Sequence, residues 1–104
     1  FLITGGAGFI GSHFTKMLLQ ERFDLTPGKV TVVDALTYSG NLWNLREVND
    51  FINFEFVEGD ICNSELMMGL IQILKEVTIE HNIILYYHYL QNENHLKTGI
   101  KWVL

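Results

Sequence analysis

Apolar and polar positions change their period along the chain, and each period predicts a structural element. Phe1–Ile3 is wholly apolar and precedes a cluster of glycines, which predicts the end of a buried strand. From Phe14 onward apolar residues recur at intervals of three and four, the spacing of a helix that packs on one face. We expect this helix to span about Gly8–Arg22, because Pro27 and Gly28 then terminate the element.

The remaining chain repeats the order of strand and helix. Val30–Val33 is apolar or β-branched throughout, as in a strand buried on both faces. A short helix is predicted from the N-cap Asn41 through Leu42, Leu45 and Val48, followed by a strand over Ile52–Glu58. The next predicted helix is capped by Asn63 or Ser64 and carries on one face Leu66, Leu70, Ile73, Leu74 and Val77. We then expect a strand over Ile83–Leu90 and one or two helical turns within Leu96–Leu104.

This alternation predicts an α/β fold. We expect a Rossmann-like, doubly wound parallel sheet, truncated to about four strands, with right-handed crossovers and helices on both faces. The fourth strand would lie beside the first, across the crevice where such sheets bind ligands.

A glycine-rich turn, Thr4–Gly11, joins the first strand to the first helix. Gly5 and Gly6 permit a sharp reversal of the chain, and Gly8 lets the phosphates of a ligand approach the backbone. Gly11 would let the helix pack closely on the strand, and the helix N-terminus attracts an anion. Between a strand and a helix this pattern predicts a dinucleotide site, whereas the alternative is an ordinary strand-to-helix turn.

An acidic residue, Asp34, ends the second predicted strand, about 20 residues beyond the last glycine. A carboxylate at this place hydrogen-bonds the ribose hydroxyls of the adenosine and repels a 2′-phosphate. The sequence therefore favours NAD over NADP as the cofactor. The alternative is that Asp34 only caps the turn that follows the strand.

Composition narrows the partners further. The net charge is −5, with 7 Lys and Arg against 12 Asp and Glu, so no basic surface for nucleic acid is expected. No apolar run is long enough for a membrane span, and the four histidines lack the spacing of metal ligands. The lone cysteine, Cys62, is typical of a small buried residue and of a reducing compartment such as the cytoplasm. The apolar start, without Met or a basic leader, indicates a truncated strand rather than a signal peptide.

Three segments together carry a family resemblance: Thr-Gly-Gly-Ala-Gly-Phe-Ile-Gly over residues 4–11, Asp-Ala-Leu-Thr-Tyr-Ser-Gly-Asn over 34–41, and Gly-Asp-Ile-Cys over 59–62. They resemble the extended short-chain dehydrogenase/reductase family, and within it the dTDP-glucose 4,6-dehydratases, a branch of NAD-dependent sugar-nucleotide lyases. The resemblance covers residues 1–75, whereas 76–104 diverge. It implies that residues 1–104 are part of an NAD-binding Rossmann domain.

The resemblance also implies roles for individual residues. Phe9 and Ile10 would lie over the pyrophosphate, and Asp34 would bind the adenosine ribose. Asp60 would bind the adenine amino group, while Ile61 packs on the ring. The complete set of implied cofactor-binding residues is Gly5, Gly8, Phe9, Ile10, Gly11, Asp34, Ala35, Leu36, Thr37, Asp60 and Ile61. For Asp60 the residues leave an alternative open, that its carboxylate only satisfies N–H groups at a helix start.

The catalytic residues of the family have no counterpart in this chain. The family pairs a tyrosine with a lysine four residues later, and its dehydratases add an Asp-Glu pair; none of the tyrosines Tyr38, Tyr86, Tyr87 and Tyr89 has such a lysine, and no Asp-Glu dipeptide occurs. No catalytic residue is therefore predicted. The expected function is that of an NAD-binding fragment of a dehydratase-like enzyme, inactive by itself. The alternatives are a fragment of a UDP-sugar 4-epimerase-like enzyme, which downstream sequence would distinguish, and a non-catalytic dinucleotide-binding or residual protein, left by a deletion or a damaged reading frame. The sequence leaves the oligomeric state open.

Overall fold

The computed structural model of the chain describes residues 1–77, 84–87 and 100–103. In these ranges the strands form one sheet in the order β3-β2-β1-β4-β5. The strands are β1 (Leu2–Thr4), β2 (Val30–Asp34), β3 (Phe54–Glu58), β4 (Ile84–Tyr87) and β5 (Ile100–Val103). β1 pairs in parallel with β2 and β4, and β2 pairs in parallel with β3. The predicted parallel sheet is confirmed for β1–β4, with the fourth strand beside the first, and a fifth strand adds to it.

The last strand differs from the prediction. Helical turns were expected within Leu96–Leu104, but Ile100–Val103 forms β5, which is antiparallel to β4. Three of these four residues are β-branched or aromatic, which favours a strand, and the open edge of β4 supplies backbone partners. The other residues of that expectation lie outside the described ranges, as do Ile83 and residues 88–90 of the predicted fourth strand.

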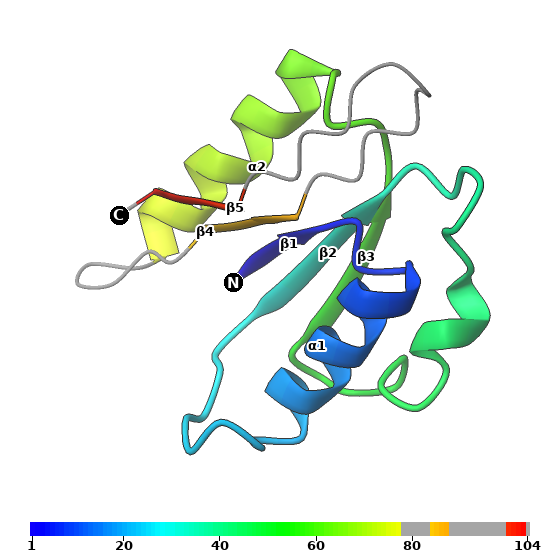
Figure 1. Ribbon diagram of the computed structural model, residues 1–104. Helices are drawn as coiled ribbons and strands as arrows, with labels where there is room; N and C mark the ends of the chain where they lie inside the picture. The colour runs from blue at the N-terminus through cyan, green and yellow to red at the C-terminus, as the bar shows by residue number, and fades with distance from the viewer. Residues whose placement is uncertain (78–83, 88–99, 104) are drawn as a thin grey trace.

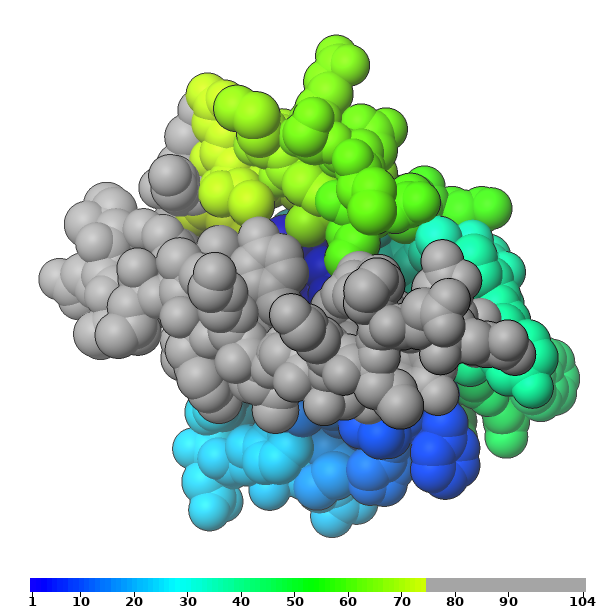
Figure 2. Space-filling view, turned by 45° about the horizontal axis from the view of Figure 1, so that its top comes forward, coloured from blue at the N-terminus to red at the C-terminus, as the bar shows by residue number. Residues whose placement is uncertain are grey.

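Helices cover both faces of the sheet. The helical segments are α1 (Phe9–Leu19), the 3₁₀ helix η1 (Leu42–Leu45) and α2 (Ser64–Val77). Figure 1 shows α1 and α2 on opposite sides of the sheet, and Figure 2 shows their residues at opposite edges of the molecule. In the described ranges, neither α-helix combines the length and the apolar character that crossing a bilayer demands.

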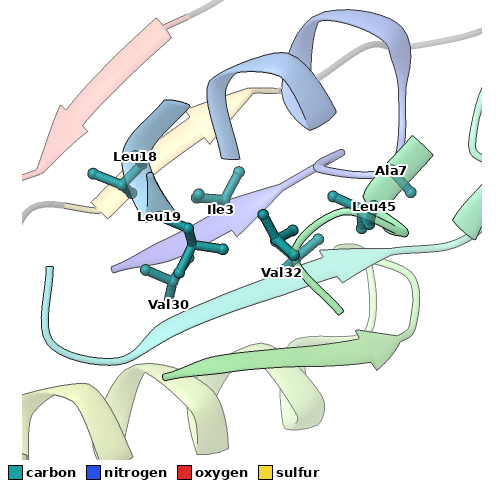
Figure 3. Close-up of a cluster of buried hydrophobic side chains, with 8 residues drawn as sticks. Ile3, Ala7, Leu18, Leu19, Val30, Val32 and Leu45 are labelled. Atoms are coloured by element: carbon teal, nitrogen blue, oxygen red, sulfur yellow. The ribbon is translucent and has the colours of Figure 1, made fainter. Parts of the chain in front are cut away.

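The core has two layers because consecutive strand residues point to opposite faces. Ile3 and Val32 pack with Leu18 on the α1 side, as Figure 3 shows. Leu2 and Val33 instead pack with residues of α2 on the other side. Strands apolar on both faces thus place a helix over each face.

Helix α1 ends at Leu19, three residues before the predicted end. Glu21 adopts a left-handed conformation with φ 57°, which stops the helix. The N–H groups of Glu21 and Arg22 donate to the carbonyls of Leu18 and Met17, at 3.1 and 2.9 Å. This is the hydrogen-bond pattern of a Schellman motif, formed here with a glutamate at the position that glycine usually takes.

Helix α2 begins as predicted and faces the sheet slightly differently. Asn63 is its cap, because the Asn63 Oδ1 accepts from the N–H of Leu66 at 3.1 Å. Ile73, predicted to lie on the buried face, is 52% exposed. Met67 and Ile71 pack on the sheet and were not predicted to do so. The observed buried face of α2 is therefore rotated about the helix axis by part of a turn from the predicted one.

Candidate functional site

A cleft of about 490 Å³ opens at the carboxyl ends of β1, β2 and β3. Its volume is typical of a small-molecule site, and it lies at the carboxyl ends of parallel strands, where doubly wound sheets bind ligands. The lining residues are Thr4, Gly5, Gly8, Phe9, Ile10, Gly11, Val33, Asp34, Ala35, Thr37, Tyr38, Ser39, Gly40, Gly59, Asp60, Ile61 and Cys62.

The glycine-rich turn forms one wall of this cleft. Gly5 has a φ of 67°, a conformation in which side chains are strained, and its N–H donates to the carbonyl of Val33 at 2.8 Å. Its own carbonyl accepts from the N–H of Gly8 at 3.2 Å. A Cβ on Gly11 would lie 2.1 Å from that carbonyl oxygen. The crossing of β1 and α1 therefore requires glycine at position 11, and the positive φ favours glycine at position 5.

Gly8 stands in a different environment. A Cβ there would be 3.4 Å from the Gly5 carbonyl oxygen and 3.8 Å from the Ser39 Oγ, both ordinary contacts. Its backbone, with φ −75° and ψ 177°, is extended and open to any residue. Protein packing therefore does not require a glycine at position 8. Because Gly8 has no side chain, it leaves room in the cleft for a ligand to approach the backbone.

The side chain of Asp34 is buried where β2 meets the turn, with 8% of the residue exposed. Its Oδ2 accepts from the N–H of Ala7 at 2.8 Å, and its Oδ1 accepts from the N–H of Leu36 at 2.9 Å. The carboxylate thus ties the glycine turn to the loop after β2. A carboxylate oxygen can accept two hydrogen bonds, so Asp34 keeps capacity for the hydroxyls of a ligand.

The loop after β2 folds tightly around this carboxylate. Leu36 has a φ of 51°, and its side chain packs against the α1-side core. The side chain of Leu36 therefore does not line the cleft, unlike Ala35 and Thr37 on either side, and its implied role in cofactor binding stays a prediction. Gly40 lies against Asp34, where a Cβ would be 2.6 Å from Oδ1.

The residues directly after β3 form another wall of the cleft. The Asp60 Oδ1 accepts from the N–H of Cys62 at 2.8 Å, so this carboxylate does satisfy an N–H group before α2. Cys62 is exposed at the cleft, and the expectation of a buried thiol was wrong. The hydrogen bond and the negative charge of Asp60 raise the pKa of the Cys62 thiol, which disfavours a reactive thiolate.

Sequence reasoning located most of this cleft. All residues of the implied set except Leu36 line it. Next to the implied residues, Thr4, Val33, Gly59 and Cys62 also line the cleft. The loop that returns from Asp34 toward the glycine turn adds Tyr38, Ser39 and Gly40, which the implied set did not include. The positive φ of Leu36, which carries no clear sequence signal, sets that path. In the described part of the chain, no group of three His, Cys, Asp or Glu residues is arranged to hold a metal ion.

The fold and the cleft define a Rossmann-type α/β domain of the kind that carries nucleotide cofactors in dehydratases. Comparison with protein families identifies the group. Residues 2–84 match the family described as GDP-mannose 4,6 dehydratase, and the chain belongs to that family.

Individual relatives point in the same direction. The chain is 52% identical over 83 residues to a dTDP-glucose 4,6-dehydratase of an Actinoplanes species, an alignment that covers 77% of this chain and 25% of the relative. It is 38% identical over 101 residues to the dTDP-D-glucose 4,6-dehydratase of Dictyostelium discoideum, covering 97% of this chain and 22% of that one. The chain thus spans about a quarter or less of the length of these relatives.

Similar solved structures are also dTDP-glucose 4,6-dehydratases. The dTDP-glucose 4,6-dehydratase of Bacillus anthracis, in complex with NAD, matches with a TM-score of 0.62 and 47% identity, covering 69% of this chain and 22% of that one. A double mutant of the Streptomyces venezuelae enzyme, with NAD and a second ligand bound, matches with a TM-score of 0.65 and 45% identity, covering 67% and 22%.

Proposed function

We propose that this chain holds NAD, as the cofactor-binding part of a dTDP-glucose 4,6-dehydratase-like enzyme, and that it has no turnover by itself. One observation carries the proposal. The glycine turn, the Asp34 carboxylate and the Asp60–Ile61 pair open onto one cleft from three neighbouring parallel strands. In this proposal the glycine turn binds the phosphates, Asp34 binds the ribose, and Asp60 and Ile61 bind the adenine.

At the phosphate end, the first N–H groups of α1 lack intrahelical acceptors and offer donors to the pyrophosphate. Phe9 and Ile10 are 88% and 57% exposed, so their side chains are available to cover it. Gly8 leaves the space through which the phosphates approach. Gly5 and Gly11 act indirectly, by allowing the turn and α1 to pack at this distance.

At the adenosine end, Asp34 accepts the ribose hydroxyls with the lone pairs that Ala7 and Leu36 leave unused. A 2′-phosphate would bring negative charge and no donor against this buried carboxylate, which supports NAD over NADP. Asp60 is exposed and can accept from the adenine amino group, while Ile61 offers an aliphatic surface to the ring. Ala35 and Thr37 complete this wall.

Turnover needs groups that this chain does not supply. When bound, NAD supplies the acceptor for a hydride from the sugar in the intact family enzyme. None of the four tyrosines is followed at the fourth position by the lysine that depresses a catalytic tyrosine's pKa. The sugar nucleotide is therefore a substrate of the intact enzyme only. The dehydratase names of the relatives favour this function over that of a UDP-sugar 4-epimerase.

Two further properties form part of the proposal. Residues 1–104 act as one partial cofactor-binding domain, with 1–75 family-like and 76–104 divergent. A cytoplasmic location is consistent with a single cysteine that is free and exposed, since such a thiol persists best in a reducing compartment.

Calorimetric titration of the purified chain with NAD, NADP and buffer tests the proposal. We expect saturable heat with NAD and a markedly weaker response to NADP, in protein whose circular dichroism shows an α/β fold. No heat with millimolar NAD in the folded chain would refute cofactor binding and favour a residual, non-binding protein. Equal affinity for NADP would refute the role of Asp34.

Activity measurements complete the test. A mixture of the chain, NAD and dTDP-glucose should form no keto-sugar product and no NADH. Product formation would overturn the statement that the chain has no turnover, while leaving the binding result intact.

A further inference from the structure

Asn44 lies on η1, away from the cleft lining, yet its side chain contacts the glycine turn. The Asn44 Nδ2 donates to the carbonyl oxygen of Ala7 at 2.9 Å. The N–H of Asn41 donates to the same oxygen at 3.1 Å, and the N–H of Ala7 donates to Asp34 Oδ2 at 2.8 Å. Both peptide groups that flank the Ala7 Cα are therefore fixed by partners outside the turn.

The peptide between Ala7 and Gly8 is restrained along both edges. Its carbonyl accepts from Asn44 and Asn41, while its N–H, which belongs to Gly8, donates to the Gly5 carbonyl at 3.2 Å. Rotation of this peptide would break all of these bonds. Gly8 caps α1, so the orientation of this peptide sets the direction of the first N–H groups of the helix.

Asn44 donates from a rigid support. The Asn41 Oδ1 accepts from the N–H of Trp43 at 2.9 Å, and the Asn41 carbonyl accepts from the N–H of Asn44 at 3.0 Å, so η1 begins with a capped turn. Leu45, the next residue, is 2% exposed and belongs to the same core cluster as Ala7. Figure 3 shows Ala7 and Leu45 together at one end of that cluster.

We propose that Asn44 is a positioning residue for the cofactor. It holds the Ala7–Gly8 peptide in the orientation in which the N-terminus of α1 meets the pyrophosphate. This role rests on the proposed function, and it deepens it by assigning a residue outside the cleft to the phosphate end alone. Asn44 bonds the Ala7 carbonyl, and neither the Asp34 carboxylate nor the Asp60–Ile61 wall, so adenosine keeps its contacts when the Asn44 side chain is removed.

Asn44→Ala is the test variant, and Asn53→Ala is its matched control. Asn53 makes the same kind of bond, from its Nδ2 to the carbonyls of Pro27 and Gly28 at 3.2 and 3.0 Å. It precedes β3, so it lies at the opposite end of the strands from the cleft. Both variants lose amide-to-carbonyl hydrogen bonds, and only one of them alters the glycine turn. Asn44→Ala should fold, because the N–H of Asn41 still binds the Ala7 carbonyl.

Binding is measured for NAD and for adenosine, which lacks the phosphates. Asn44→Ala should bind NAD about three- to tenfold more weakly, the range expected for one lost neutral hydrogen bond. Its affinity for adenosine should match the wild type, and Asn53→Ala should match the wild type for both ligands. An equal loss of NAD affinity in both variants would show a merely structural role. A parallel loss for adenosine would also overturn the proposal.

Amide hydrogen exchange in the ligand-free chain separates this inference from the proposed function. The N–H groups of Ala7 and Gly8, which donate to Asp34 Oδ2 and to the Gly5 carbonyl, should exchange faster in Asn44→Ala than in Asn53→Ala. Unchanged exchange at these residues would overturn the positioning role. If the wild type binds no NAD, the proposed function fails, and faster exchange in Asn44→Ala alone would still establish that Asn44 orders the turn.

Discussion

Gly8 and Gly11 belong to the same turn, yet alanine should destabilise the fold strongly at position 11 and only slightly at position 8. At Gly11 a Cβ would lie 2.1 Å from the Gly5 carbonyl oxygen and 2.9 Å from the Gly6 Cα. These are backbone atoms, so β1, the turn or α1 must shift. At Gly8 the nearest atom would be 3.4 Å away, which needs no shift. Substitutions at these two positions therefore distinguish a glycine that the packing requires from a glycine that leaves space for a ligand.

The size of each effect follows from these contacts. Overpacking in a rigid site costs about 1–3 kcal/mol or more, and Gly11→Ala should lie at the upper end. For a domain of this size, that lowers the Tm by about 10 °C or more. Gly8→Ala should cost less than about 1 kcal/mol, the scale of an altered helix N-cap. Gly8→Val should retain the fold but fill the path of the phosphates, and NAD binding should be lost.

Thermal unfolding followed by circular dichroism measures the first effect, and NAD titration of the folded variants measures the second. A Gly11→Ala variant that melts with the wild type would refute the close crossing of β1 and α1. Full NAD affinity in Gly8→Val would show that the turn has only a structural role. Gly8→Ala serves as the control for introducing a side chain at position 8.

Two further predictions concern carboxylates. Asp34→Asn exchanges an acceptor for an amide NH₂ that would face the N–H of Ala7 or Leu36; unfolding in urea should show a loss of about 1–3 kcal/mol, and titration should show no gain of NADP binding. A fully stable variant, or one that prefers NADP, would contradict this. The Lys29 Nζ, 2.6 Å from the Glu55 Oε2, is the main cause that lowers the pKa of Glu55 below 4.5. A carboxyl group whose pKa is lower in the folded than in the unfolded state stabilises the fold at pH values above its unfolded pKa. This contribution is lost as the pH falls through the folded-state pKa. Glu55→Gln should therefore cost up to about 1 kcal/mol near neutral pH, since both side chains are half exposed, and nothing well below pH 4.5. A difference that persists in acid, measured by urea unfolding, would contradict the assignment.

The sequence by itself determined the parallel sheet and the parts of the site that depend on local pattern. Runs of β-branched residues set β2, helical spacing set α1, and the spacing of the glycines indicated the turn. Asp34 could be located because a residue at the end of a parallel strand reaches the same edge as its neighbours. These features depend on residues close together in the chain, which is why they could be read from it.

Only the tertiary structure decided how these parts contact one another. Asn44 and Ala7 are 37 positions apart, and their hydrogen bond depends on how η1 packs beside α1. The side chain of Leu36 turns into the core because its backbone adopts a positive φ to follow the Asp34 carboxylate. Cys62 is exposed because the chain leaves the sheet before α2 begins. Each outcome depends on long-range packing, whose direction a local pattern does not encode.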